Sequence, residues 1–224
     1  MVQNSMVQKK TDKTREALLL AGEELMGWRG IEAVSVRDIN ARAGQKNTSA
    51  IRYHFDNKEG LLEAILDDRM VHLDRLRADA LAGLLTQGTA STKKTTPPVA
   101  ELVRVLILPL AHMVIAHEPW QNYILLLAQI VSAQGASYQP LWHGKHDGTA
   151  VAIIQLCRTQ QPDLDPVHWE QRVRDMMTFT IGSLCERVYT ARQAGRDRRL
   201  TDEQYLAHLL GMATLMLTAP PLGL

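Results

Sequence analysis

The sequence predicts an all-α protein, in which an N-terminal three-helix domain of helix-turn-helix type is followed by a C-terminal helical bundle, with about nine helices in total. Apolar side chains recur at helical spacing along most of the chain, and N-cap residues and glycines mark where segments begin and end. Strand signals are absent, since no run alternates with a period of two and no Asn-Gly hairpin turn occurs. An apolar content of 46% is normal for a globular protein with a full core.

Composition limits the class of protein further. The 224 residues can form one large domain or two smaller ones, and a net charge of +1 gives no strong overall attraction to nucleic acid. Residues 1–58 carry ten Lys and Arg against seven Asp and Glu, so the N-terminal part is the basic end. Two cysteines fit a reducing cytosol, and the apolar run from Leu102 to Ala116 is too interrupted to span a bilayer. We expect a cytoplasmic protein that does not enter the membrane.

The first helix is predicted from about Thr11 to Trp28, with Gly30 as its stop, and residues 1–10 are predicted to be a flexible arm. One face of this helix is apolar at helical spacing and should hold the next two helices in place. That inward stripe consists of Ala17, Leu18, Ala21, Leu25 and Met26.

The second helix is predicted to begin after Ser35, which is a favourable N-cap with Asp38 in the position of its capping-box partner. Val34 and Ile39 flank this cap as a hydrophobic staple does. Gly44 follows the helix, and glycine readily takes the left-handed conformation that ends helices.

A third helix should follow this turn, capped by Asn47 or Thr48. Ile51 and Phe55 stand four residues apart and can pack inward. The outward face carries small hydroxyls, an arginine and a tyrosine, at Thr48, Ser49, Arg52 and Tyr53. Such a face suits the major groove of DNA, although two short helices around a glycine also fit an ordinary helical hairpin.

Four features in and around this unit resemble the N-terminal domain of the TetR family of transcriptional regulators. They are the Ala- and Leu-rich first helix that ends at Gly30, the run "SVRDINARAG" from Ser35, the triplet "YHF" from Tyr53, and a Lys-Glu-x-Leu-Leu helix start from Lys58. The distance from Gly44 to Phe55 is one residue longer than is usual in the family. The resemblance covers about residues 10–66.

The resemblance implies a helix-turn-helix DNA-binding domain, which we place at residues 1–60, and a ligand-binding and dimerisation bundle at residues 61–224. Arg52 is the best candidate for reading a base directly, because a guanidinium can bind both acceptors of guanine. By the resemblance Tyr53 and Lys58 contact phosphates, whereas His54 fits either a phosphate donor or a packed core histidine. The predicted DNA-binding residues are Arg37, Lys46, Asn47, Thr48, Ser49, Arg52, Tyr53, His54 and Lys58.

A long helix is predicted from Asp56, with an apolar stripe over about five turns, and a tilt at one end of such a helix moves the other. Residues 87–98 are predicted to be a surface loop, and Pro109 is expected to bend the helix that follows. The remaining helices are expected at about residues 98–117, 120–133, 149–160, 165–194 and 201–218, with Glu118-Pro119 as a break and Asp165 and Thr201 as N-caps.

The last two predicted helices carry more apolar surface than a small bundle buries within itself. Pairing them with their copies in a second subunit would form a four-helix interface, as the TetR family does. We therefore expect a homodimer, whose two-fold axis would place two recognition helices about one DNA turn apart.

The middle helices offer candidates for an effector site, because a mostly apolar pocket with a few polar groups suits a small apolar or amphipathic organic ligand. Each candidate also fits an ordinary core position. The predicted ligand-binding residues are His112, Met113, Trp120, Tyr123, Leu127, Trp142, Met176, Phe179 and Thr180.

Catalytic and metal-binding motifs are not found. The sequence has no Gly-rich phosphate loop, no Gly-x-Ser-x-Gly elbow and no Cys-x-x-Cys, and His143 and His146 lack further ligands at metal-site spacing. We therefore predict no enzyme activity, metal or cofactor. The predicted function is a DNA-binding transcriptional regulator, most simply a repressor that a small organic ligand releases from double-stranded operator DNA. The alternative is a small-molecule-binding helical protein with little or no DNA affinity.

Overall fold

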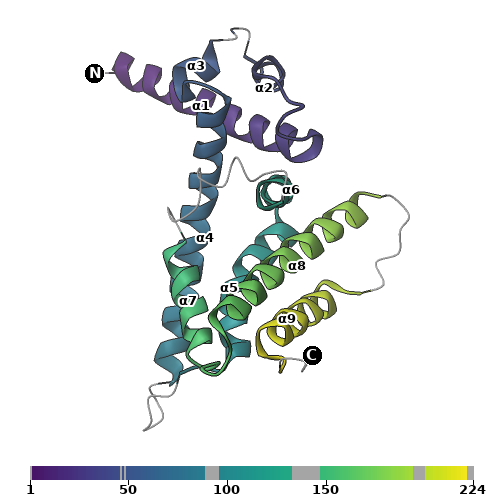
Figure 1. The fold of residues 1–224 in the computed structure, drawn as a ribbon. Coiled ribbons are helices and arrows are strands. Elements are labelled where there is room, and N and C mark those ends of the chain that lie inside the picture. Colours follow the sequence, from purple (N-terminus) through teal and green to yellow (C-terminus); the bar gives the residue numbers. More distant parts are fainter. Residues whose placement is uncertain are drawn as a thin grey trace. The chain divides into compact units, whose positions relative to one another are not determined.

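The computed structural model describes residues 2–45, 47, 49–88, 96–132, 147–193 and 200–220. These ranges contain nine helices and no strand, which confirms the predicted all-α fold (Figure 1). The helices are α1 (Val2–Arg29), α2 (Val36–Arg42), α3 (Ala50–Phe55), α4 (Lys58–Gly88), α5 (Val99–Ala116), α6 (Glu118–Val131), α7 (Gly148–Arg158), α8 (Pro166–Arg192) and α9 (Asp202–Thr218).

The helices divide into two compact units. The head unit comprises Met1–Arg69 and Glu118–His143, and the bundle unit comprises Met70–His117 and Gly144–Leu224. Helix α4 gives its first part to the head unit and its remainder to the bundle unit. The head unit therefore contains α6 in addition to the first three helices. The functional boundary predicted at residue 60 stays a prediction.

The core of the head unit lies where α1 packs against α2, α3 and α6. Helix α1 buries Leu18 and Met26 completely, while Ile39 of α2 and Ile51 of α3 are at most 1% exposed. Most of the inward stripe predicted for α1 is buried, and only Ala17 is half-buried. These apolar side chains fix α2 and α3 on α1, so the orientation of the outward face of α3 is set by the packed core beneath it.

Helix α1 begins at Val2, so the flexible arm predicted for residues 1–10 is wrong for residues 2–10, whose backbone is helical. This segment contains no proline or glycine that would stop a helix. Its Gln, Lys and Met side chains also lose little rotamer freedom in a helix. The sequence therefore contains no signal that would start the helix only at Thr11.

Glu118 and Pro119 start α6 rather than separate two helices, because α5 ends at Ala116 and α6 begins at Glu118. Proline is tolerated in the first turn of a helix, since its missing N–H has no partner to lose there. A proline can therefore mark the start of a helix as readily as its end. The predicted break is therefore only the single residue His117.

Helix α5 is the core helix of the bundle unit, since it packs against α7, α8 and α9. It buries eight residues, including Leu102, Val103 and Leu106, and it runs on past Pro109. By length and composition alone, α5 is the one helix within the described ranges that is apolar enough to cross a membrane, with a mean hydropathy of 2.0. Its packing against three neighbouring helices accounts for this apolar character.

The predicted caps of α8 and α9 are confirmed. The Asp165 carboxylate accepts a hydrogen bond of 2.8 Å from the amide of Val167. At α9, the Thr201 hydroxyl accepts from the amide of Gln204 at 3.2 Å, and the Gln204 side chain accepts from the Thr201 amide at 3.0 Å. This capping box satisfies two amides that a helix start otherwise leaves without a partner.

Replacing Thr201 with Ala should lower the free energy of unfolding by about 1 kcal/mol, because the amide of Gln204 loses its acceptor. For a chain of this size the melting temperature should fall by about 2–4 °C. Thr178→Ala, on the exposed face of α8, is the matched control and should leave the melting temperature unchanged or slightly raised. Equal shifts for the two variants would remove any special role for the cap.

Both cysteines are buried free thiols. Burial raises the pKa of Cys157 to about 11 and that of Cys185 to about 12. Neither thiol is therefore a reactive thiolate at neutral pH, and both act as small apolar core residues.

Candidate nucleic-acid interface

Helix α2 starts with the capping box predicted from the sequence. The Ser35 hydroxyl accepts from the amide of Asp38 at 3.2 Å, and the Asp38 carboxylate accepts from the Ser35 amide at 3.0 Å. The hydrogen bonds from the side chain and the backbone of Ser35 lower the pKa of Asp38. Asp38 is therefore ionised at neutral pH and holds the first turn of α2 in a fixed orientation.

The turn between α2 and α3 is built around Gly44, which has the left-handed φ of +68° that glycine adopts without strain. The amide of Gln45 donates to the carbonyl of Asn40 at 2.9 Å and closes the end of α2. The side chain of Asn47 accepts from the amide of Ser49 at 3.0 Å, but the N-cap of α3 is Ser49, whose own side chain makes no capping hydrogen bond. The cap predicted at Asn47 or Thr48 is therefore wrong, because the first helical turn begins one or two residues later. Lys46 and Thr48 lie outside the described residues.

Helix α3 has one buried face and one exposed face. Ile51 is 1% exposed and Phe55 is 8% exposed, whereas Tyr53 is 78% exposed. Arg52 and Ser49 are also exposed. A tyrosine ring that stands this far into solvent on a supported helix is unusual for a core-forming side chain, and it presents a flat surface and a hydroxyl to a partner.

His54 lies between these two faces. Its ring meets the ring of Tyr53 edge-on, with centroids 4.9 Å apart, and it is half-buried. Burial and, to a lesser extent, the charge of Arg15 lower the pKa of His54 below its ordinary value of 6.5. The imidazole is therefore neutral at pH 7 and contributes at most a neutral hydrogen bond to a phosphate.

Lys58 has an internal role that the sequence did not suggest. Its ammonium group donates to the carbonyl oxygens of Ile31, at 2.8 Å, and Val34, at 3.1 Å, in the connection between α1 and α2. The side chain is half-buried. Lys58 thus ties the start of α4 to the segment before α2, and its predicted phosphate contact stays a prediction.

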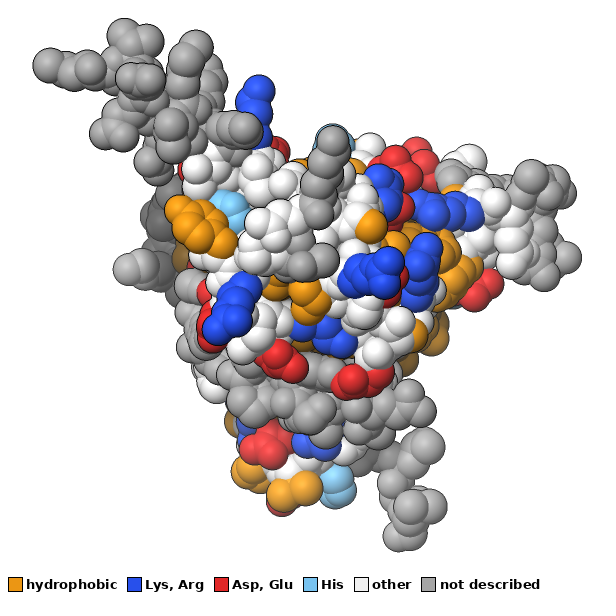
Figure 2. Space-filling model, turned by 90° about the horizontal axis from the view of Figure 1, so that it is seen from above, with side chains coloured by type: hydrophobic (Ala, Val, Ile, Leu, Met, Phe, Trp, Pro, Cys, Tyr) orange, Lys and Arg blue, Asp and Glu red, His pale blue; other side chains and the backbone are white. Residues whose placement is uncertain are grey.

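The basic side chains of the interface are spread out. Arg37 and Arg52 are exposed, while Arg42 is paired with Glu24 at 2.6 Å. Figure 2 looks onto α1 to α3 and shows Lys and Arg side chains lying among uncharged and acidic ones. Among the residues described on this surface, basic side chains are therefore interspersed with others and do not form a continuous patch.

Two side chains of α6 that sequence reasoning missed hold the end of α1. The Gln129 amide donates to the carbonyls of Met26, at 2.9 Å, and Gly27, at 3.1 Å, and its oxygen accepts from the amide of Ile31 at 2.9 Å. Asn122 accepts from the indole N–H of Trp28 at 2.8 Å. No local pattern in the sequence pairs residues that lie this far apart along the chain.

Gly27 permits this contact. A Cβ atom added at Gly27 would lie 2.6 Å from the backbone oxygen of Asn122, which is closer than real Cβ contacts. Only glycine therefore lets α1 and α6 approach as they do.

The predicted effector residues divide between the units. Trp120, Tyr123 and Leu127 are buried on α6 in the head unit, where the rings of Trp120 and Tyr123 meet edge-on at 5.5 Å. On α5 and α8 in the bundle unit, Met176 and Thr180 are buried, Met113 and Phe179 are half-buried and His112 is exposed. Trp142 lies outside the described residues, as do His143 and His146. Among the residues that the structure describes, no group of three or more His, Cys, Asp or Glu could hold a metal ion.

Residues 18–65 match the family described as bacterial regulatory proteins, tetR family. The N-terminal segment is a TetR-type DNA-binding domain. The match spans α2, the turn and α3, and so assigns the exposed α3 face to the helix-turn-helix unit of that domain. No curated protein matches the chain in sequence.

Solved structures of TetR-type regulators share the fold over nearly the whole chain. NalD, described as the secondary repressor of the MexAB-OprM multidrug efflux pump in Pseudomonas aeruginosa, is 19% identical, with 91% of this chain and 96% of that chain covered and a TM-score of 0.57. A TetR-family regulator from Rhodococcus sp. is 19% identical, with 92% and 100% covered and a TM-score of 0.53. One from Shewanella sp. PV-4 is 17% identical, with 91% and 95% covered and a TM-score of 0.56. The chain thus combines a segment that matches the TetR-type DNA-binding domain with the fold of these solved structures.

Proposed function

We propose that this protein is a transcriptional regulator of TetR type, a cytoplasmic repressor that binds double-stranded operator DNA as a homodimer and leaves it when a small organic ligand binds. The observation that carries the proposal is the two-faced α3, with Ile51 and Phe55 buried and Arg52 and Tyr53 exposed. In this proposal Arg52 reads a base, while Arg37, Ser49 and Tyr53 contact phosphates. Lys46, Asn47, Thr48 and His54 complete the proposed contact surface.

The homodimer is supported by apolar side chains that α8 and α9 leave exposed. Leu215 is 58% exposed, Tyr189 is 44% exposed and Met212 is 37% exposed, all on these two helices. Large apolar side chains left exposed on two helices that pack together are typical of a surface that a partner covers. A second copy of the chain gives a two-fold assembly with two α3 helices, which a near-palindromic operator requires.

Release by a ligand needs a route from the effector to the DNA-binding helices. Helix α4 is the one described helix that has residues in both units. Helix α6 carries two of the candidate effector residues, Trp120 and Tyr123, and its Gln129 side chain forms hydrogen bonds with the end of α1. A ligand that favours one arrangement of α4 or α6 can therefore bias the position of α2 and α3. The energy available for release equals the difference in ligand affinity between the two arrangements.

The decisive experiment measures binding of the protein to the DNA upstream of its own gene as a function of salt. Binding that is specific in sequence and weakens with salt supports the regulator. Absence of retardation at micromolar protein would favour the alternative, a ligand-binding helical protein without DNA affinity.

Arg52→Ala should relax the preference for the operator over unrelated DNA by about tenfold or more, because one bidentate contact to a base contributes about 1–3 kcal/mol of discrimination. Competition gel shifts with operator and scrambled duplexes measure this ratio. Arg75→Ala removes an exposed arginine of α4 in the bundle unit and should leave the ratio unchanged. If Arg52→Ala kept both affinity and preference, Arg52 would not be the base-reading residue.

A further inference from the structure

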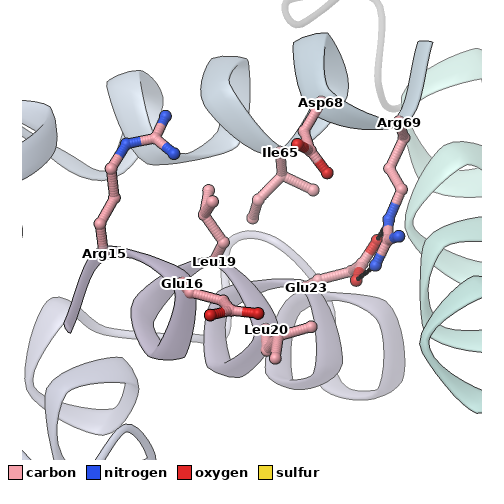
Figure 3. A pocket seen from close by; sticks show the side chains of 8 residues that line it. All are labelled: Arg15, Glu16, Leu19, Leu20, Glu23, Ile65, Asp68 and Arg69. Carbon is pink, nitrogen blue, oxygen red and sulfur yellow. Dashed lines mark hydrogen bonds and ion pairs between the residues drawn. The ribbon is translucent and has the colours of Figure 1, made fainter. Parts of the chain in front are cut away.

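A cleft of about 320 Å³ lies within the head unit, between α1 and the part of α4 that ends at Arg69 (Figure 3). Five of its lining side chains come from α1 and three from α4. Its volume is at the lower end of the range of small-molecule sites, which is about 300–1,000 Å³. None of the predicted effector residues lines this cleft.

The middle of the cleft is apolar. Ile65 points from α4 toward Leu19 of α1, and Leu20 lies farther out on α1, beside Glu16 (Figure 3). Ile65 is 2% exposed, whereas Leu20 is 43% exposed. A ligand with a hydrocarbon part would therefore gain free energy by covering Leu20.

The cationic groups of the cleft already have partners. At one end Arg69 donates to both carboxylate oxygens of Glu23, at 2.7 Å and 2.6 Å, and this carboxylate is almost completely buried. At the other end the guanidinium of Arg15 lies over the ring of Phe55, 5.3 Å from its centroid. An anion would have to compete with these contacts.

The two remaining acidic groups have no direct partner. Glu16 and Asp68 are exposed, and within the described part of the chain neither makes a hydrogen bond or a close ion pair, although the charge of Asp68 helps to raise the pKa of Arg69. Asp68 projects from α4 into the cleft, and Glu16 lies on the α1 side, with Leu19 and Ile65 between them (Figure 3). Two carboxylates beside an apolar floor complement a molecule that has a positive head and a hydrocarbon body.

We propose that this cleft binds a small amphipathic cation of the alkylammonium class. Its ammonium group lies by Asp68, Glu16 adds negative charge on the α1 side, and its hydrocarbon part covers Leu19, Leu20 and Ile65. The site lies in the head unit beside the helix that supports α2 and α3, and it is distinct from the proposed effector site. It does not depend on the proposed function, because its binding is measured without DNA.

The test compares three probes that share one hydrocarbon chain: n-octylammonium, n-octanol and octanoate, each below its micelle-forming concentration. Methyl NMR of the full-length protein reports on the site directly, and Ile65→Val identifies the Ile65 signal. Octylammonium should shift the Ile65 and Leu19 methyl signals in a saturable way and bind at least about fivefold more tightly than octanol or octanoate. Equal binding of the three probes, or shifts confined to other methyl groups, would overturn the proposal.

Asp68→Asn should weaken octylammonium binding by about three- to tenfold and leave octanol binding unchanged, since only the charge partner is removed. Glu59→Gln removes a carboxylate from the same helix outside the cleft and is the matched control. Both positions are exposed, so both variants should fold, and their melting temperatures verify this. An unchanged affinity of Asp68→Asn for octylammonium would also contradict the site.

Discussion

Replacing Arg69 with Met is expected to lower the free energy of unfolding by about 3–5 kcal/mol. Arg69 binds both oxygens of Glu23, whose side chain is 2% exposed, and its guanidinium also lies over the ring of Trp120 at 4.9 Å. Removing the guanidinium leaves a buried carboxylate without its partner. Urea unfolding at pH 8 measures the loss.

The pH dependence of this variant separates an electrostatic cause from lost packing. Burial raises the pKa of Glu23 above its ordinary value of 4.5 even in the presence of Arg69. Without Arg69 the pKa should rise further, because the charged carboxylate loses its compensation. Between the unfolded and the folded pKa, the folded state then binds more protons than the unfolded state, so stability falls as pH rises. Arg69→Met should therefore be less destabilised at pH 5 than at pH 8.

A double variant completes this prediction. Glu23→Leu combined with Arg69→Met removes both charges and should recover most of the stability that Arg69→Met loses, because an apolar pair of similar volume replaces the ion pair. The recovered stability should no longer change between pH 5 and pH 8. A double variant as unstable as the single one would show that packing against Trp120, and not the charge pair, is what Arg69 provides.

Gln129→Leu is expected to destabilise the head unit by about 2–3 kcal/mol, because the buried amide of Ile31 loses its acceptor and two carbonyls at the end of α1 lose their donor. Hydrogen exchange should speed up at Ile31, since this amide then depends on local opening alone. Exchange measured by mass spectrometry on peptides that cover this turn, together with urea unfolding, tests both effects.

Gln121→Leu is the control for this change. It alters the same residue type on the same helix at a half-buried position for which the structure shows no hydrogen bond. Stability and exchange near Ile31 should stay within experimental error of the parent protein. A loss as large as that of Gln129→Leu would mean that α6 is sensitive to any such substitution, and the particular contacts of Gln129 would lose their significance.

Local signals allowed much of the fold to be predicted. Ser35 and Thr201 mark helix starts through hydrogen bonds to residues three positions later, so a short stretch of sequence contains the whole interaction. Ile51, Phe55 and the exposed Tyr53 follow in the same way from helical spacing. Pro119 misled the prediction because one residue type serves both at helix starts and at helix stops.

The contacts that could not be predicted from the sequence are those between residues that lie far apart along the chain. Glu23 is a residue type expected on the solvent-exposed face of a helix, and only the fold brings Arg69 to it. Lys58 belongs to a motif that suggested phosphate contact, yet its ammonium group reaches carbonyls that precede α2. Gln129 likewise meets the end of α1 only after folding. Such contacts carry no periodicity, so helical spacing and caps cannot reveal them.

The head unit is assembled from two separate stretches of the chain, one that ends at Arg69 and one that contains α6. Recombination between related genes at a single point after α3 would transfer a new α1 and α1–α2 connection without the α6 that Gly27 and Ile31 fit. Chimaeras designed to change operator choice should therefore carry residues 118–131 together with the N-terminal segment, and those joined at one crossover should express as poorly folded protein.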